Sequence, residues 1–185
     1  MKNYILFIIF AITLVSCGGD VTPKPTSLLR LEYPMPAYYD TLTRYPFSLE
    51  INAFSKLQNK SNGAIEIHYP KMKATVYLTY KPVNNDLNDL LLDAQKLTYK
   101  NHVIKADEII EQPFINPDDK VYGMFYSVGG DAATNALFYA TDSTKNFVTA
   151  SVYFYAKPNF DSIMPAANYI TKDMKRMLET IKWEK

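Results

Sequence analysis

The single cysteine of the chain, Cys17, is the residue with the clearest chemistry. It follows an apolar segment, residues 4–15, which is interrupted only by Thr13 and is preceded by Lys2. This segment is shorter than the roughly 20 apolar residues that cross a bilayer as a helix, and it has the length of a signal-peptide core. Positions 14–17 read Leu-Val-Ser-Cys, the lipobox pattern, in which the cysteine thiol becomes a diacylglyceryl thioether. The sequence therefore predicts lipidation of Cys17.

The position of Cys17 divides the chain into three predicted parts. Residues 1–16 are a lipoprotein signal peptide, residues 17–27 are a lipidated tether that Pro23 and Pro25 keep extended, and residues 28–185 form one folded domain. We expect a cell-envelope protein, held by its lipid on the inner or outer membrane. No dense acidic run follows Cys17, which favours a periplasmic face. The alternative is an ordinary signal peptide with an incidental cysteine, or an uncleaved membrane anchor.

The two histidines of the chain do not form a metal-binding pattern. Neither His68 nor His102 has a second histidine or a cysteine at the spacing of a metal site. His68 shares one side of a predicted strand with Glu66, so we expect a surface or interface residue. His102 follows a predicted helix, whose C-terminal end interacts favourably with a cation. The sequence therefore predicts neither a metal ion nor a cofactor.

Three further patterns lack the partners that their chemistry needs. Residues 129–133 lack the spacing and the lysine of a phosphate-binding loop, and Asp118-Asp119 lacks the alternating oxygen ligands of a calcium loop. Ser127 and Ser162 lack the flanking glycines of a nucleophile elbow. We expect solvated turns at the first two places. No set of acid, base and nucleophile can be assembled, so we do not expect an enzyme.

The fifteen tyrosines are the unusual feature of the composition, whereas the net charge of +1 gives no electrostatic footprint for nucleic acid. Tyrosine is common in β-strands and is enriched at protein interfaces. Two interpretations stay open: the tyrosines stabilise a sheet, or some of them form a surface that binds a partner. The candidate partner surface comprises Tyr33, Tyr38, Tyr39, Tyr77, Tyr122 and Tyr126.

The first half of the domain is predicted to be an antiparallel meander followed by a helix. Alternating apolar residues indicate three strands, at residues 47–51, 65–69 and 74–80. Before them, residues 28–44 are rich in tyrosine and proline and predict an extended arm, either a loop packed on the core or a binding strand. A helix begins at Asn84 or Asn85, either of which can cap it, and its apolar stripe continues to Leu97.

Four more strands are expected in the second half, near residues 109–115, 121–128, 135–141 and 147–156. The last has the strongest pattern, because alternate residues from Val148 to Ala156 are apolar. Phe147, Tyr153 and Tyr155 lie on its opposite face, so both faces should be partly covered. This pattern is typical of a central strand.

A long helix completes the predicted fold. Asp161 or Ser162 caps it, its apolar face continues to Ile181, and Trp183 should pack back on the sheet. The order of elements is βββαββββα. The predicted fold class is therefore α+β, a mostly antiparallel sheet flanked by two helices that cover one face of the sheet or both.

Short segments in a fixed order make the chain similar to a known family. It resembles the gliding-motility lipoprotein D family (GldD) over nearly the whole mature region. The matching pieces are Pro23-Lys24-Pro25, Tyr45-Pro46-Phe47, Ile67-His68-Tyr69-Pro70, residues 74–81, His102 with Lys105-Ala106, residues 129–133, Thr141-Asp142-Ser143, Val152-Tyr153-Phe154, Pro158-Asn159 with Asp161-Ser162, and residues 173–183. The second half also resembles the PsbP/Mog1-type α/β fold.

The resemblance implies a non-enzymatic accessory or assembly component of the gliding machinery, which is coupled to type IX protein secretion. Other envelope proteins of that apparatus are the implied partners, and the lipidated cysteine of the family corresponds to Cys17. The alternative is a periplasmic lipoprotein that binds a small ligand or glycan through a tyrosine-rich surface. A large closed pocket would favour a ligand, and a flat exposed aromatic patch would favour a protein partner.

Overall fold

The computed structural model describes residues 33–102, 106–130, 132–155 and 160–184. The predicted signal peptide and tether, with Cys17, lie outside these residues. None of the described helices has the length and apolar content to cross a bilayer. The described elements are β1 (Tyr38–Leu42), β2 (Phe47–Asn52), β3 (Lys56–Asn59), β4 (Ile65–Tyr69), the short 3₁₀ helix η1 (Pro70–Met72), β5 (Ala74–Pro82), α2 (Leu87–His102), β6 (Ala106–Asn116), β7 (Val121–Gly130), β8 (Ala136–Thr141), β9 (Asn146–Phe154), α3 (Phe160–Glu179) and β10 (Lys182–Trp183).

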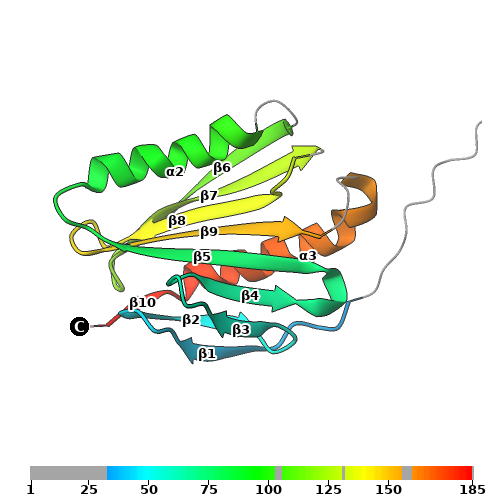
Figure 1. Ribbon diagram of the computed structural model, residues 1–185, viewed down its shortest axis with the longest axis horizontal. Coiled ribbons are helices and arrows are strands. Elements are labelled where there is room, and N and C mark those ends of the chain that lie inside the picture. Colours follow the sequence, from blue (N-terminus) through cyan, green and yellow to red (C-terminus); the bar gives the residue numbers. More distant parts are fainter. Residues whose placement is uncertain (1–32, 103–105, 131, 156–159, 185) are drawn as a thin grey trace, which may run out of the picture.

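The strands form two antiparallel sheets (Figure 1). The large sheet has the order β3-β4-β5-β9-β8-β7-β6, and the small sheet has the order β1-β2-β10. The predicted α+β class is therefore confirmed. Strand β9 has three strands on each side, and Val148, Ala150 and Val152 are buried on one of its faces. The prediction that this segment forms a central strand is therefore confirmed.

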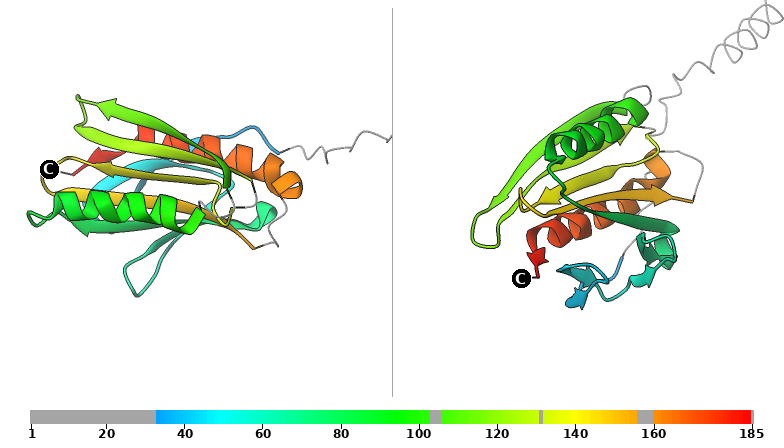
Figure 2. Two further views of the ribbon diagram at one scale, coloured as in Figure 1. Left: turned by 90° about the horizontal axis from the view of Figure 1, so that it is seen from above. Right: turned by 60° about the vertical axis from the view of Figure 1, so that its left-hand side comes forward.

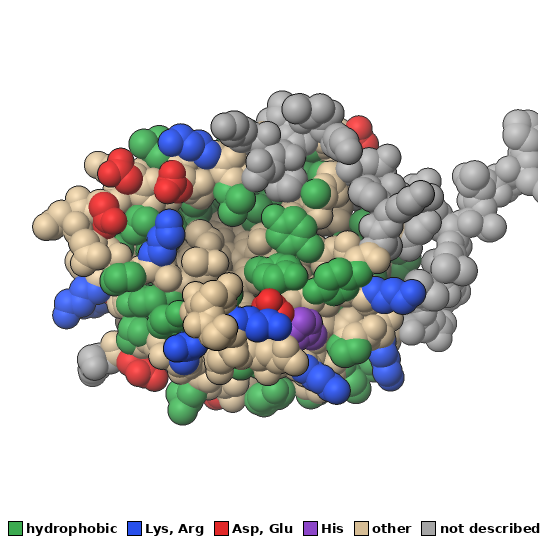
Figure 3. Space-filling view, in the orientation of Figure 1, with side chains coloured by type: hydrophobic (Ala, Val, Ile, Leu, Met, Phe, Trp, Pro, Cys, Tyr) green, Lys and Arg blue, Asp and Glu red, His purple; other side chains and the backbone are tan. Residues whose placement is uncertain are grey.

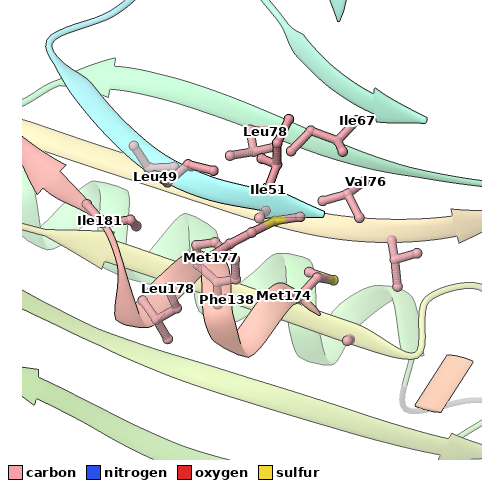
Figure 4. Close-up of a cluster of buried hydrophobic side chains, with 14 of the residues drawn as sticks. Leu49, Ile51, Ile67, Val76, Leu78, Phe138, Met174, Met177, Leu178 and Ile181 are labelled. Atoms are coloured by element: carbon pink, nitrogen blue, oxygen red, sulfur yellow. The ribbon is translucent and has the colours of Figure 1, made fainter. Parts of the chain in front are cut away.

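Helix α3 and the small sheet together cover one face of the large sheet. Met174, Met177 and Leu178 of α3 pack with Leu49 and Ile51 of β2 in the main core (Figure 4). These side chains are at most 2% exposed, and full burial of each contributes about 1.5–3 kcal/mol. This core fixes the position of α3 against the two sheets.

Helix α2 packs on the opposite face of the large sheet, so the two helices lie on different faces (Figure 2). Leu90 and Ala94 of α2 contact Phe147 of β9. Further along the helix, Leu97 packs on a second cluster that contains Tyr126 and Leu137. The contacts of α2 with the sheet therefore lie over β6, β7, β8 and the start of β9.

The predicted meander in the first half is confirmed for β4 and β5, which pair as antiparallel neighbours, and is wrong for β2. Strand β2 does not pair with β4; it pairs with β1 and with β10, where Trp183 lies opposite Phe47. The neighbour of β4 is instead β3, a short strand with Leu57 as its only apolar residue. Such a polar edge strand has no alternating pattern, so its pairing was invisible in the sequence. The part of the arm from Tyr38 to Leu42 is also a strand, β1.

A buried carboxylate attaches β1 and the preceding arm to α3. The hydroxyl of Tyr38 donates to Asp173 Oδ1 at 2.7 Å, and Asn52 Nδ2 donates to Asp173 Oδ2 at 2.8 Å. Asp173 is 1% exposed, and burial raises its pKa although both hydrogen bonds oppose the rise. Next to it, Tyr169 donates to the carbonyl oxygen of Pro34 at 3.1 Å. These hydrogen bonds fix Pro34 and Tyr38, at the start of the described residues, against α3.

Replacing Val152 by Asp should destabilise the protein by more than about 3 kcal/mol, because an unpaired charge would enter the core of the central strand. Urea denaturation followed by circular dichroism measures the change. The control is Thr79→Asp, at an exposed position of the neighbouring strand β5, which should cost about 1 kcal/mol or less. A Val152→Asp variant that unfolds like the wild type would contradict the central placement.

Removing the hydroxyl of Tyr38 with Tyr38→Phe should destabilise the protein by about 1–3 kcal/mol, because Asp173 loses a buried donor. Tyr39→Phe is the control, since Tyr39 is 47% exposed and should change stability by less than about 0.5 kcal/mol. The loss should shrink as the pH falls below the raised pKa of Asp173, because a protonated carboxyl is a weaker acceptor. Equal losses in both variants, by urea titration, would rule out the attachment.

Candidate functional site

Part of one face of the large sheet is left uncovered by α2. The side chains on this part come from β4, β5 and the second half of β9, and we call it the open face. Figure 3 shows side chains of the hydrophobic class, in which tyrosine is included, gathered below α2. The members of the open face are Glu66, His68, Thr75, Tyr77, Tyr153 and Tyr155.

Strand register brings these side chains together. Glu66 lies opposite Tyr77, and His68 lies opposite Thr75. On the other side of β5, Thr75 lies opposite Tyr153. The rings of Tyr77 and Tyr153 meet edge to face with centroids 5.7 Å apart. Alternation along each strand therefore places the aromatic rings and the polar groups on the same surface.

A continuous chain of polar contacts crosses the open face. Glu66 Oε2 lies 3.1 Å from Lys60 Nζ and 2.9 Å from His68 Nε2. The other ring nitrogen, His68 Nδ1, lies 2.9 Å from Thr75 Oγ1. Thr75 Oγ1 and the Tyr155 hydroxyl are 2.7 Å apart. This series of contacts fixes the orientation of His68 and Tyr155.

The tyrosine hydroxyls form the last link of this chain. Tyr155 Oη and Tyr77 Oη are 3.2 Å apart. The hydrogen bond with Tyr155, together with burial and the negative charge of Glu66, raises the pKa of Tyr77 to about 12. Tyr77 is therefore neutral at physiological pH, and the open face offers hydroxyl groups and ring edges instead of phenolate charge.

Thr75, His68 and Glu66 follow the order of a nucleophile, a base and an acid, but their geometry does not suit catalysis. Thr75 is 0% exposed, and its hydroxyl already contacts both His68 and Tyr155. A substrate carbonyl has no access to this oxygen. These contacts orient the aromatic rings and leave Thr75 unable to act as a nucleophile.

An open groove lies at one end of the open face. Its volume is about 370 Å³, and its charged or polar lining comes from Lys56, Gln58, His68 and Lys73, with Tyr155 as the aromatic wall. Tyr155 is 61% exposed. Within the described residues, Lys56 and Lys73 form no ion pair with a carboxylate, and no cluster of acidic or histidine side chains could hold a metal ion.

The structure does not bring the six tyrosines of the predicted partner surface together. Tyr77 lies on the open face, whereas Tyr33 packs on Tyr169 and Tyr38 binds Asp173. Tyr39 is exposed on β1, and Tyr122 is half-buried on β7.

Tyr126 is 2% exposed beneath α2, so its ring belongs to the core. Tyr153 and Tyr155 were missing from the predicted surface. Their common strand face was visible in the sequence, but their proximity to Tyr77 depends on the pairing of β5 with β9, which no local pattern indicates.

Tyr155→Phe should lower the pKa of Tyr77 from about 12 toward the ordinary value of 10.0, because the hydrogen bond with Tyr155 is the largest cause of its shift. Carbon-13 NMR of labelled tyrosine rings, with Tyr77→Phe for assignment, measures the titration. Tyr39→Phe serves as the control, because Tyr39 lies on β1, away from this network. An unchanged Tyr77 titration in Tyr155→Phe would show that the two hydroxyls do not interact.

Comparison with known proteins agrees with the resemblance found in the sequence. No curated protein matches the chain. The family described as gliding motility lipoprotein GldD matches residues 18–183, which begin directly after Cys17 and include all the described elements. The match covers most of the chain. The chain therefore belongs to the gliding motility lipoprotein GldD family.

Proposed function

We propose that this protein is a non-enzymatic accessory or assembly component of the gliding apparatus and of the type IX secretion that is coupled to it. In this proposal, acyl chains on Cys17 hold it on an envelope membrane, facing the periplasm, and the open face binds another envelope protein of the apparatus. The observation that carries the proposal is the uncovered tyrosine surface formed by Tyr77, Tyr153 and Tyr155.

The composition of the open face suits a protein partner. Tyrosine is enriched at interfaces, where it supplies a large contact area together with a polar tip. The rings of Tyr77 and Tyr155 are already held by hydrogen bonds, so little side-chain freedom is lost on binding. Cross-strand aromatic pairs also stabilise an antiparallel sheet whose face is left to water, so the mutant test below is needed to separate the two roles.

Lipidation of Cys17 would supply the location. Each buried methylene of an acyl chain contributes about 0.8 kcal/mol, so two or three chains hold a protein durably on a bilayer. The family match supports a lipoprotein, and it begins at residue 18, directly after the predicted lipidation site. The anchor would keep the open face close to other membrane-held components and so raise their effective concentration.

The groove beside Tyr155 favours a second candidate function, the binding of a small ligand or a glycan. Its volume of about 370 Å³ and its mixture of aromatic, amide and cationic groups would suit a sugar. The groove is open, however, and a closed pocket was the feature that would favour a ligand over a protein. We therefore keep the protein partner as the leading proposal.

Deletion of the gene should abolish gliding or type IX secretion, and the wild-type gene should restore them. The double variant Tyr77→Ala/Tyr153→Ala should fail to restore them, because loss of a central interface tyrosine typically weakens binding by about 2 kcal/mol, or roughly 30-fold. Colony spreading, secretion assays and immunoblots of the membrane fraction give the readouts. Tyr39→Ala, which removes an exposed tyrosine of β1, is the matched control and should restore function.

Cys17→Ala provides a separate arm of this experiment. It should abolish acyl labelling and release the protein from membranes, while the Tyr77→Ala/Tyr153→Ala protein stays labelled and membrane-bound. A deletion strain with intact gliding and secretion would overturn the proposed function. Persistent labelling of Cys17→Ala would overturn the proposed anchor.

A further inference from the structure

One end of the molecule combines lysines with exposed apolar side chains. Four segments meet there, residues 33–39, 51–59, 67–75 and 153–155. The backbone N–H of Ala53 donates to the carbonyl oxygen of Ala37 at 2.7 Å, and the backbone N–H of Tyr155 donates to the carbonyl oxygen of Lys73 at 2.8 Å. Lys56 lies opposite His68 in the pairing of β3 with β4. We call this region the basic end and define it by Met35, Phe54, Lys56, Lys71 and Lys73.

The charge of the basic end is one-sided. The four segments, residues 33–39, 51–59, 67–75 and 153–155, contain three lysines and no aspartate or glutamate. Lys56, Lys71 and Lys73 are all exposed. Asp107 and Glu108 lie at the same end of the strands, but they belong to β6, the opposite edge of the large sheet from β3 and β4. The basic end is therefore a local positive surface on a protein whose net charge is only +1.

Apolar side chains are exposed beside these lysines. Met35 is 87% exposed and Phe54 is 45% exposed. Phe54 lines a small crevice together with Tyr33, Lys71 and Met72. Lysines next to exposed aromatic and aliphatic side chains are typical of surfaces that enter the boundary between lipid headgroups and acyl chains.

The described chain also begins at this end, where Tyr33 lies beside Phe54. Cys17 precedes Tyr33 by 16 residues, which reach at most about 55 Å when fully extended. The bonds of Pro34 with Tyr169 and of Tyr38 with Asp173 keep the start of the described chain at this end. A tether from a lipidated Cys17 would therefore join the folded part of the protein at this end.

We propose that the basic end rests on an anionic phospholipid bilayer, with Lys56, Lys71 and Lys73 close to lipid phosphates and with Met35 and Phe54 at the headgroup boundary. This inference rests on the proposed lipidation of Cys17, which supplies the bilayer. The strands of the large sheet then stand upright on the membrane, because η1 and the end of β9 lie at the basic end. The open face looks sideways, toward proteins in the same membrane.

The test uses the mature full-length chain with Cys17→Ser, so that only the protein surface can bind lipid. Co-sedimentation with phosphatidylcholine vesicles, with and without phosphatidylglycerol, measures partitioning. The chain should prefer the anionic vesicles, and Lys56→Gln/Lys71→Gln/Lys73→Gln should lower that partitioning about 100-fold, roughly fivefold for each lysine. Phe54→Ser should weaken binding even at high salt, where the electrostatic attraction is screened.

The matched control is Lys81→Gln/Lys120→Gln/Lys145→Gln, which removes the same charge at the opposite end of the strands. It should lower partitioning by less than about threefold, because its lysines lie more than a Debye length from the bilayer. An equal loss in both triple variants, or no preference for anionic vesicles, would overturn the basic end as a membrane contact. Acyl labelling of Cys17 in cells decides the anchor independently, and the lysine variants should leave it unchanged.

Discussion

The width of a seven-stranded sheet, compared with the width of one helix, determines which surface of this protein is free. Strands about 4.8 Å apart make the large sheet roughly 30 Å wide, whereas a helix with its side chains is about 10 Å across. On one face, α3 shares the covering with the small sheet, and the core beneath them is closed. On the other face α2 is the only described helix, and its contacts lie over β6, β7, β8 and the start of β9. The open face exists because, on this side of the sheet, no second element among the described residues covers β4 and β5.

The two surfaces described above differ in how their charges are satisfied. On the open face, Glu66 is paired with Lys60 and His68, and the tyrosine hydroxyls bond to one another. A partner that displaces water there meets groups that already have hydrogen bonds, so the desolvation penalty is small. At the basic end the lysines have no such carboxylate partners among the described residues. The open face, which is neutral and aromatic, therefore suits a protein partner, and the basic end, which is positive, suits the phosphate groups of lipids.

Local sequence patterns predicted the helices and strands, whereas contacts between distant segments determine how the strands pair and which side chains are buried. The apolar alternation of β9 and the apolar face of α3 were strong enough to be read from the sequence, because both elements are buried along most of their length. The pairing of β2 was not predictable, since its alternation suits either sheet and the choice depends on α3 and Trp183. Tyr126 and Tyr77 look equivalent in the sequence. Only the docking of α2 buries the first and leaves the second on the open face.

The pairing of β1 with β2 has a mechanical consequence. Five register pairs connect β1 to β2. A pull applied at Tyr38 parallel to the strand would load these pairs together instead of opening them one after another. The buried bond between Tyr38 and Asp173 shares the load and passes it to α3. Under the proposed lipidation of Cys17, β1 would thus resist being pulled away from the rest of the fold when neighbouring components move.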